Sequence, residues 1–221
     1  MNRDWTSYIP DFWDALGETL SMVAIAGSII IVVGLIVGTT LYMTAPGSIA
    51  QNRTVYYVLT TIVNVGRSIP FLILIVIAIP VTRLVVGTTL GPVAALVPLT
   101  LGFAPFFSRL VESALREVDP GRIEAAKAMG ISRFQFIFRV LLPESVSGLI
   151  AAVTIILVGT VEGTAVAGAV GAGGLGDFAL RYGYQRFYPE LMLLAVVAMV
   201  LIVQAIQLSG DFWVRARKHK R

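Results

Sequence analysis

Two charged residues interrupt otherwise apolar stretches of the sequence, and they are the first candidates for chemistry. Glu162 lies within AAVTIILVGTVEGTAVAGAVGAGG, and Arg67 lies within a second apolar run. A carboxylate at the centre of a lipid-facing helix costs about 3 kcal/mol on insertion scales, so Glu162 must meet water or a partner. It can attract a solute ammonium group, pair with Arg67, or be protonated in a dry packing site. The sequence leaves these alternatives open.

The residues around Glu162 include a stripe of small side chains. Gly159, Gly163 and Ala167 are spaced by four residues, which favours either close helix packing or a cavity along a pathway. Arg67 also has an alternative role, because a long cationic side chain can reach phosphate headgroups from within a membrane span. The residues predicted to line a solute pathway are Arg67, Glu162, Gly163, Thr164 and Val166.

Thiol and histidine chemistry are excluded by composition. The chain has no cysteine, and its one histidine, His219, lies in a basic tail. The phosphate-binding pattern GxxxxGK[ST] is absent, so the chain does not hold ATP in a P-loop. The sequence therefore predicts no catalytic residue, no metal site and no cofactor in this chain.

Two glycine motifs point to chemistry that the context disfavours. GAGGLG at residues 171–176 matches a dinucleotide-binding pattern, but it follows an apolar run and not a strand. A tight connecting or re-entrant loop is the preferred interpretation, because glycine allows unusual backbone angles. Gly174 to Asp177 also matches the GxGD pattern of intramembrane aspartyl proteases. The other aspartates lie outside or at the ends of the predicted spans, so no carboxylate dyad is expected.

The composition predicts that these residues sit in a membrane protein. Hydrophobic residues make up 57% and charged residues 14%, against about 25% charged in soluble domains. Five runs are long enough to cross about 30 Å of hydrocarbon as helices. They cover about 19–42, 56–80, 89–110, 143–168 and 191–208. The sequence predicts an all-α polytopic protein with five transmembrane helices, and residues 1–18 lack the basic and apolar regions of a secretory signal.

The distribution of Lys and Arg predicts the orientation. Of seventeen such residues, twelve lie between the first and second spans, between the third and fourth, or after the fifth, if Arg109 at the end of the third span is included. By the positive-inside rule these segments are cytoplasmic and the N-terminus is outside. Residues 1–18 are therefore predicted to be extracytoplasmic and residues 211–221 to be a basic cytoplasmic tail. The net charge of +4 is explained by this tail, which acts as a cytoplasmic membrane anchor. Binding to nucleic acid is not needed to explain it.

The cytoplasmic segment 111–142 contains signals for two short helices. Asp119 is a candidate N-cap with Pro120 in the first turn, and Gly130 is a candidate helix end. Ser132 and Gln135 have the spacing of a capping box for a second helix, which stops at Pro143. The alanines of the first helix give a low-relief surface suited to docking another protein. The same pattern is equally consistent with a solvent-exposed amphipathic helix in the loop.

This segment resembles the EAA loop of binding-protein-dependent ABC permeases. Glu124-Ala125-Ala126, Gly130 and Leu142-Pro143 match its spacing, with Val140 where the family has Ile. The resemblance implies the type I ABC importer permease fold over residues 19–210 and a helix that couples to a cytoplasmic ATPase. The residues expected to take part in coupling are Arg122, Glu124, Ala125, Ala126, Lys127 and Gly130.

More of the chain is similar to the methionine (D-methionine) permeases of that superfamily, including NVGRSIPFLILIVIAIPVTRLVVGT and GAVGAGGLGDF. The resemblance implies a homodimer in the bacterial inner membrane, two ATPase subunits that bind ATP and Mg, and an extracytoplasmic solute-binding protein. It implies import of an amino acid, methionine, by alternating access. The family's Tyr and Met near the pathway are replaced here by the stretch 162–166. The alternatives are a permease for another solute, such as an osmolyte or a different amino acid, and a membrane-embedded enzyme.

Overall fold

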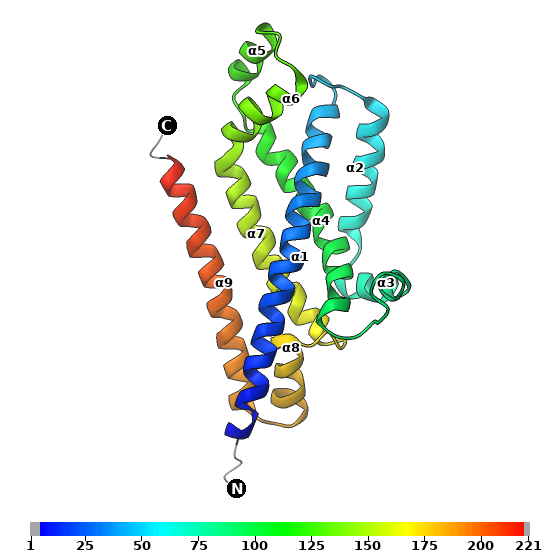
Figure 1. Ribbon diagram of the computed structural model, residues 1–221, viewed down its shortest axis with the longest axis vertical. Helices are drawn as coiled ribbons and strands as arrows, with labels where there is room; N and C mark the ends of the chain where they lie inside the picture. The colour runs from blue at the N-terminus through cyan, green and yellow to red at the C-terminus, as the bar shows by residue number, and fades with distance from the viewer. Residues whose placement is uncertain (1–4, 219–221) are drawn as a thin grey trace. The chain divides into compact units, whose positions relative to one another are not determined.

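The computed structural model describes residues 5–218, and no strand occurs among them (Figure 1). The predicted all-α architecture is confirmed. The longer helices are α1 (Ile9–Thr44), α2 (Arg53–Ser68), α3 (Phe71–Val86), α4 (Pro92–Arg116), α7 (Leu142–Gly168) and α9 (Pro189–Lys218). The shorter elements are η1 (Thr6–Tyr8), α5 (Pro120–Ala128), α6 (Arg133–Gln135), η2 (Phe136–Leu141), α8 (Gly174–Phe178) and η3 (Ala179–Gln185). Residues 1–4 of the predicted N-terminal segment, and His219, Lys220 and Arg221 of the basic tail, lie outside the described residues.

Within residues 5–218, four helical segments are long and apolar enough to cross a membrane: Thr6–Thr44, Pro92–Arg116, Arg133–Gly168 and Pro189–Ala216. The second predicted span, about 56–80, is divided. Its first half is α2 and its second half belongs to α3, so it provides a fifth span only if the broken pair crosses together. The break falls at Ile69, because a residue that precedes proline avoids helical backbone angles. Pro80, expected to end the span, lies inside α3.

The chain divides into two compact units. The first comprises residues 1–29, 69–103 and 157–207, and the second comprises residues 30–68, 104–156 and 208–221. The core of the first unit joins α1 to the segment α8–η3 and to α9. Its buried members are Phe12, Ala15, Leu175, Phe178, Ala179, Tyr182, Leu191 and Ala195. Aromatic side chains therefore anchor the start of α1 against the segment that follows the glycine loop.

In the second unit, α1 and α4 approach each other closely through two glycines. A Cβ on Gly34 would lie 2.4 Å from the Phe107 ring, and one on Gly38 would lie 2.5 Å from the backbone oxygen of Ser108. Real side-chain atoms do not come that close, so only glycine fits at these positions. The spacing of four residues places both on one face of α1, the small-xxx-small pattern that lets membrane helices pack backbone to backbone.

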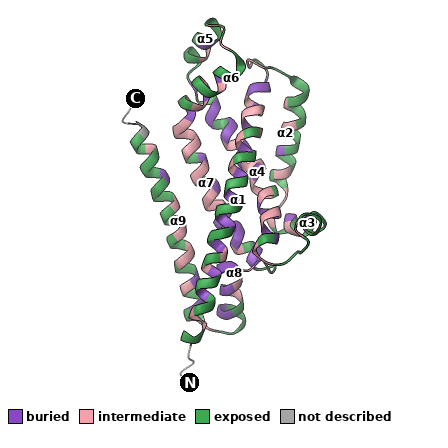
Figure 2. Cartoon of the chain, in the orientation of Figure 1, coloured by how far each residue is buried: buried purple, intermediate pink, exposed green. Residues whose placement is uncertain are grey.

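Much apolar surface is left uncovered by this chain, as expected for membrane helices. In α9 only 11% of the most apolar window is buried, and little of the helix is coloured as buried (Figure 2). Large side chains such as Leu193 and Leu201 are exposed. Exposed apolar side chains also occur throughout α3, including Ile77 and Leu84. In water this surface would promote association, whereas lipid or a second membrane subunit accommodates it.

Candidate functional site

The candidate ATPase-coupling segment, residues 119–141, is shaped by its two helix caps. The Asp119 side chain accepts a hydrogen bond from the Arg122 backbone N–H at 3.1 Å, with Pro120 in the first turn of α5. Gly130 has φ +65° directly after the helix. The Ser132 hydroxyl then accepts from the Gln135 N–H at 3.3 Å, while the Gln135 side chain accepts from the Ser132 N–H at 3.0 Å. Both predicted caps and the glycine helix end are confirmed. The second helix does not stop at Pro143 as predicted, because α6, η2 and α7 follow one another without a break and Pro143 lies in the first turn of α7.

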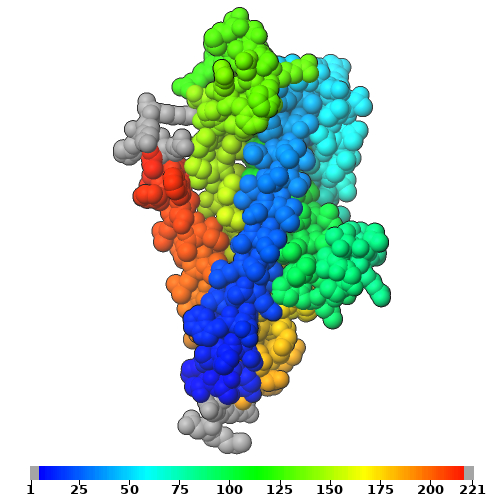
Figure 3. Space-filling view, in the orientation of Figure 1, coloured from blue at the N-terminus to red at the C-terminus, as the bar shows by residue number. Residues whose placement is uncertain are grey.

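The coupling segment forms a lobe at one end of the second unit (Figure 3). An ion pair joins Arg122 of α5 to Glu144 near the start of α7. On another side of α5, Glu124 and Lys127 line a cavity of about 220 Å³ that also touches Tyr42 and the connection between α1 and α2. The coupling segment therefore contacts α7 through the ion pair and borders the end of α1 at the cavity.

The three alanines of α5 do not share one surface, contrary to expectation. Ala126 is 1% exposed and so packs against its own chain, whereas Ala125 and Ala128 are exposed. The outer surface gains large apolar side chains that the sequence did not single out. Met129 is 70% exposed, and the exposed rings of Phe134 and Phe138 lie 4.4 Å apart between centroids. This exposed apolar surface has the character of a docking surface for another protein.

The predicted pathway residues of α7 divide between two sides of the helix. Gly163 is buried, and a Cβ there would lie 2.5 Å from the Phe103 ring of α4. Thr164 is also buried, and its hydroxyl donates to the Val161 carbonyl at 2.7 Å. Glu162 and Val166, four residues apart, are exposed and lie on the same side. The small-residue stripe thus packs against α4, and the carboxylate lies on a side that this chain leaves uncovered.

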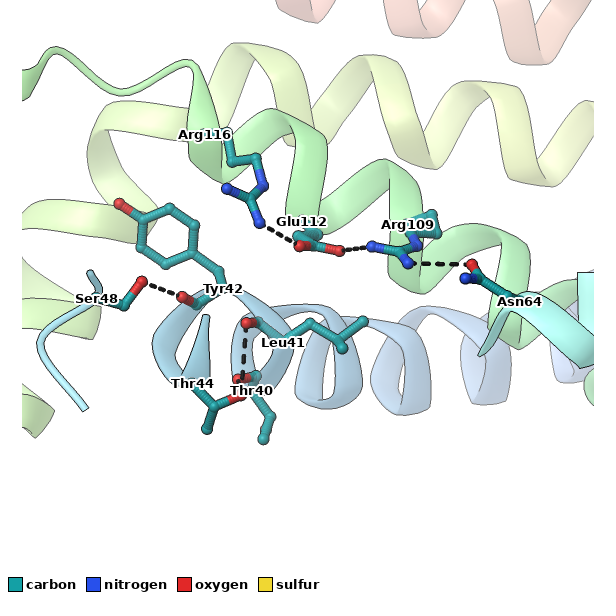
Figure 4. Close-up of polar contacts among 9 residues, drawn as sticks. All are labelled: Thr40, Leu41, Tyr42, Thr44, Ser48, Asn64, Arg109, Glu112 and Arg116. Carbon is teal, nitrogen blue, oxygen red and sulfur yellow. Dashed lines mark hydrogen bonds and ion pairs between the residues drawn. The ribbon is translucent and has the colours of Figure 1, made fainter. Parts of the chain in front are cut away.

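Arg67, the remaining predicted pathway residue, lies near the end of α2 and its guanidinium is 5.4 Å from the centroid of the Phe106 ring. The neighbouring turns carry a polar network in which Glu112 accepts from both Arg109 and Arg116, the second at 2.7 Å (Figure 4). Arg109 also donates to the side-chain amide oxygen Oδ1 of Asn64 at 3.0 Å. Because α4 continues to Arg116, this network is helical and not part of the loop predicted from residue 111 onwards.

The glycine motif at 171–176 is a connecting loop that caps a helix within its own chain. Gly171, Gly173 and Gly174 have φ of +93°, +78° and +75°, which confirms the prediction of unusual backbone angles. The Gly174 N–H donates to Glu18 of α1 at 2.6 Å, and the Leu175 N–H donates to the Thr19 hydroxyl at 2.8 Å. The amides that a dinucleotide phosphate would need are therefore already occupied.

Asp177 of the GxGD motif has closer carboxylate neighbours than the sequence indicated. A cavity of about 260 Å³ is lined by Asp177 together with Asp11, Asp14 and Glu18 of α1. However, Asp177 pairs with Arg181, and Asp11 accepts from the Tyr182 hydroxyl at 2.5 Å. Two carboxylates that each have another partner do not share a proton, so this is not a protease dyad. No group of three or more His, Cys, Asp or Glu within residues 5–218 is arranged to hold a metal ion.

The fold and the coupling segment together define a permease of an ABC importer. A family model described as "Binding-protein-dependent transport system inner membrane component" matches residues 30–218, and the chain belongs to this family of membrane-embedded permeases. The structure superimposes on a permease chain of the inward-facing MetNI methionine ABC transporter with a TM-score of 0.93 and 46% identity, covering 95% of this chain and 97% of that one. The type I ABC importer permease fold is thereby confirmed.

Two similar proteins are methionine permeases by name. The probable D-methionine transport system permease protein MetI of Vibrio cholerae is 47% identical over 206 residues, which cover 93% of this chain and 92% of that protein. The methionine import system permease protein MetP of Bacillus subtilis is 47% identical over 203 residues, covering 92% and 91% respectively. The likeness extends over almost the whole chain.

Sequence reasoning missed the network around Glu112 and the ties from Glu18 and Thr19. The first had a readable signal, because Arg109, Glu112 and Arg116 have the i, i+3 and i+4 spacing of helical ion pairs. The second had none, since Glu18 and Gly174 are 156 residues apart in the chain.

Proposed function

We propose that this chain is the permease subunit of an ATP-driven importer of methionine. The observation that carries the proposal is the coupling segment, a short capped helix with an exposed apolar surface at the position of the family's EAA loop. Nearly full-length similarity to permeases named for methionine supports the solute. Residues 162–166 differ from those expected in methionine permeases. The identity of the solute is therefore the first property to measure.

The working assembly is two copies of this chain, two cytoplasmic ATPase subunits and an extracytoplasmic solute-binding protein. The ATPases bind ATP and Mg and dock on the exposed surface of α5, and this chain performs no covalent chemistry. The N-terminus is outside and the C-terminus is cytoplasmic, which places the coupling segment on the ATPase side. Nucleotide state shifts the transporter between outward-open and inward-open forms, because each form makes different contacts with α5.

The solute passes along the exposed side of α7 that carries Glu162 and Val166. A carboxylate on this side is costly against lipid, so the second copy or a water-filled pathway covers it in the assembled transporter. There Glu162 attracts the ammonium group of the solute. Gly163 acts indirectly, by letting α7 pack against Phe103 of α4 and so fixing the direction in which Glu162 points, and the buried Thr164 hydroxyl is satisfied within α7.

Uptake of radiolabelled methionine into proteoliposomes that hold this chain with its ATPase and binding protein tests the proposal. Other amino acids and an osmolyte such as betaine are measured in parallel. Glu124→Ala is expected to lower ATP-driven uptake about tenfold, within the range of allosteric coupling energies, while the assembly still forms. Glu117→Ala is the matched control, because this exposed carboxylate lies between α4 and α5, outside the coupling helix.

The outcomes separate mechanism from solute. Methionine uptake that requires ATP and falls with Glu124→Ala but not with Glu117→Ala supports both. Uptake of a different solute with the same dependence retains the mechanism and rejects methionine. Equal effects of the two carboxylate variants would reject α5 as the coupling element, and Glu162→Ala with unchanged apparent affinity for the solute would reject the ammonium contact.

A further inference from the structure

A cavity of about 370 Å³ lies between α2 and α4 in the second unit. Its lining combines guanidinium groups with aromatic and aliphatic surface. The residues that matter for its chemistry are Arg67, Arg109, Arg116, Glu112, Phe106 and Leu110. Phe106 and Arg116 are ten residues apart on α4, so the cavity extends about 15 Å along that helix from its end at Arg116.

The positive charges of the cavity exceed the negative ones. Glu112 is 2% exposed, and its two carboxylate oxygens are taken by Arg109 and Arg116, one each. Arg67 rests on the Phe106 ring and has no carboxylate partner among the described residues of its unit. Guanidinium groups stay protonated in proteins, so three cations face one anion. The cavity therefore carries a surplus of two positive charges.

This surplus needs an anion or water. Arg67 lies near the end of α2, which belongs to a spanning segment only together with α3, and it is next to α4, which is able to cross a membrane by itself. An arginine at membrane depth is costly unless it is paired or hydrated. A cation–π contact leaves the charge of Arg67 in place. The exposed side of α2 next to Arg67 carries the polar side chains of Thr61, Asn64 and Ser68. Asn64 accepts from Arg109, and the two hydroxyls donate to backbone carbonyls of their own helix.

We infer that this cavity binds the carboxylate of the transported solute, with Arg67 as its direct partner. A guanidinium group matches a carboxylate in two parallel hydrogen bonds, and the Phe106 and Leu110 surfaces next to it suit an apolar side chain. Arg109 and Arg116 are held by Glu112 and supply positive potential to the site. The inference rests on the proposed function, and it names the chemical class that the pathway selects: a small apolar solute with one carboxylate.

The test is equilibrium binding of radiolabelled methionine to the permease–ATPase complex in nanodiscs, without the binding protein. Arg67→Gln is expected to weaken binding about tenfold, the loss of roughly one charge-assisted hydrogen bond. Arg67→Lys is expected to weaken it less, because the charge remains but the paired geometry is lost. Arg53→Gln is the control, since Arg53 begins the same helix and does not line the cavity. Methioninol, which lacks the carboxylate, should bind weakly and equally to wild type and Arg67→Gln.

Three results overturn the inference. Methionine binding that is unchanged in Arg67→Gln excludes a direct contact. An equal loss of binding in Arg53→Gln shows that these arginines act on the solute through long-range electrostatic attraction and not through a local binding site. Native mass spectrometry that finds a phospholipid lost in Arg67→Gln, with methionine binding unchanged, assigns the cavity to a lipid phosphate. ATPase activity and assembly of each variant confirm that it is folded.

Failure of the proposed function is distinguishable from failure of this site. If the wild-type complex imports a different amino acid, the same measurement is made with that solute. The carboxylate site is then supported if Arg67→Gln weakens binding of that solute, and rejected if it does not. If the wild-type complex imports a solute without a carboxylate, the inference is wrong even though the transporter works.

Discussion

The coupling segment and the glycine loop are held by different kinds of contact. In the coupling segment the caps join residues three apart, as in the bond between Asp119 and the Arg122 N–H. In the glycine loop the bonds join α1 to residues 156 positions away, and the bond between Asp11 and Tyr182 spans 171. Local caps let the coupling segment keep its shape while it moves as a unit. Long-range ties fix the glycine loop to the start of α1.

This difference suits the proposed roles of the two regions. A segment that receives the nucleotide signal must stay folded while its contacts change, and its caps do not depend on the rest of the chain. A loop at the far end of α7 must instead hold the helix in place when the pathway opens and closes. We therefore expect substitutions in the glycine loop to lower global stability, and substitutions of the caps to act mainly on the coupling segment itself.

Gly174→Ala is the substitution expected to be most damaging. Gly174 has φ +75°, and a Cβ there would lie 2.7 Å from the Thr19 hydroxyl and 2.9 Å from the Met22 side chain. Left-handed backbone costs an ordinary residue about 1–2 kcal/mol and overpacking adds about 1–3 kcal/mol, so stability should fall by about 3 kcal/mol. Denaturant unfolding in detergent measures this loss.

Gly87→Ala is the control for the Gly174 prediction. Gly87 also has a left-handed backbone, with φ +82°, but no atom lies within 4 Å of a Cβ there. Only the backbone cost of about 1–2 kcal/mol applies, so Gly87→Ala should destabilise less than Gly174→Ala. Equal losses in the two variants would show that the contact with α1 contributes nothing.

Tyr182→Phe is expected to have the next largest effect. The hydrogen bond to Asp11, followed by burial, raises the pKa of Tyr182 above its ordinary value of 10.0. The tyrosine must be protonated to donate, so its contribution is complete below the unfolded pKa and is lost as pH rises through the folded pKa. Replacing it should cost about 1.5 kcal/mol at neutral pH, as for a hydrogen bond to a charged acceptor.

Thermal unfolding of wild type and Tyr182→Phe across pH tests this linkage. The difference in unfolding temperature should be constant from about pH 7 to about pH 9 and should shrink above the unfolded pKa. A difference that persists undiminished at about pH 11 would show that the phenol contributes through packing and not through its proton.

The local contacts could be predicted from the sequence, and the long-range ones could not. Asp119, Ser132 and Gln135 have side chains that recognise backbone groups within one turn, so their spacing alone specifies the geometry. No comparable rule links Glu18 to Gly174, because their meeting depends on how whole helices pack. The division of the second predicted span was readable in principle from Ile69-Pro70, although the apolar run across it masked the break.

The candidate pathway shows the same limit. Periodicity placed Glu162 and Gly163 in one helix, but which of them faces α4 depends on the Phe103 ring beside Gly163. In the coupling segment the alanine pattern suggested a flat surface, whereas Ala126 packs inward and Met129 lies outside. Composition and spacing therefore identify the helices and their caps, and side-chain packing decides which side of each helix is available to a partner.

Ser132→Ala is the substitution expected to have the smallest effect on global stability and a selective effect on coupling. It removes the hydroxyl that accepts from the Gln135 N–H, which costs about 1 kcal/mol for an N-cap. Because the capping box lies in the coupling segment, we expect faster amide exchange over residues 132–141 and little change in the overall unfolding midpoint. Ser132→Asn keeps a capping side chain and should restore both exchange and ATP-driven uptake. If Ser132→Ala instead lowers the overall unfolding midpoint as much as Gly174→Ala does, the coupling segment does not unfold independently. The contrast between the coupling segment and the glycine loop would then be wrong.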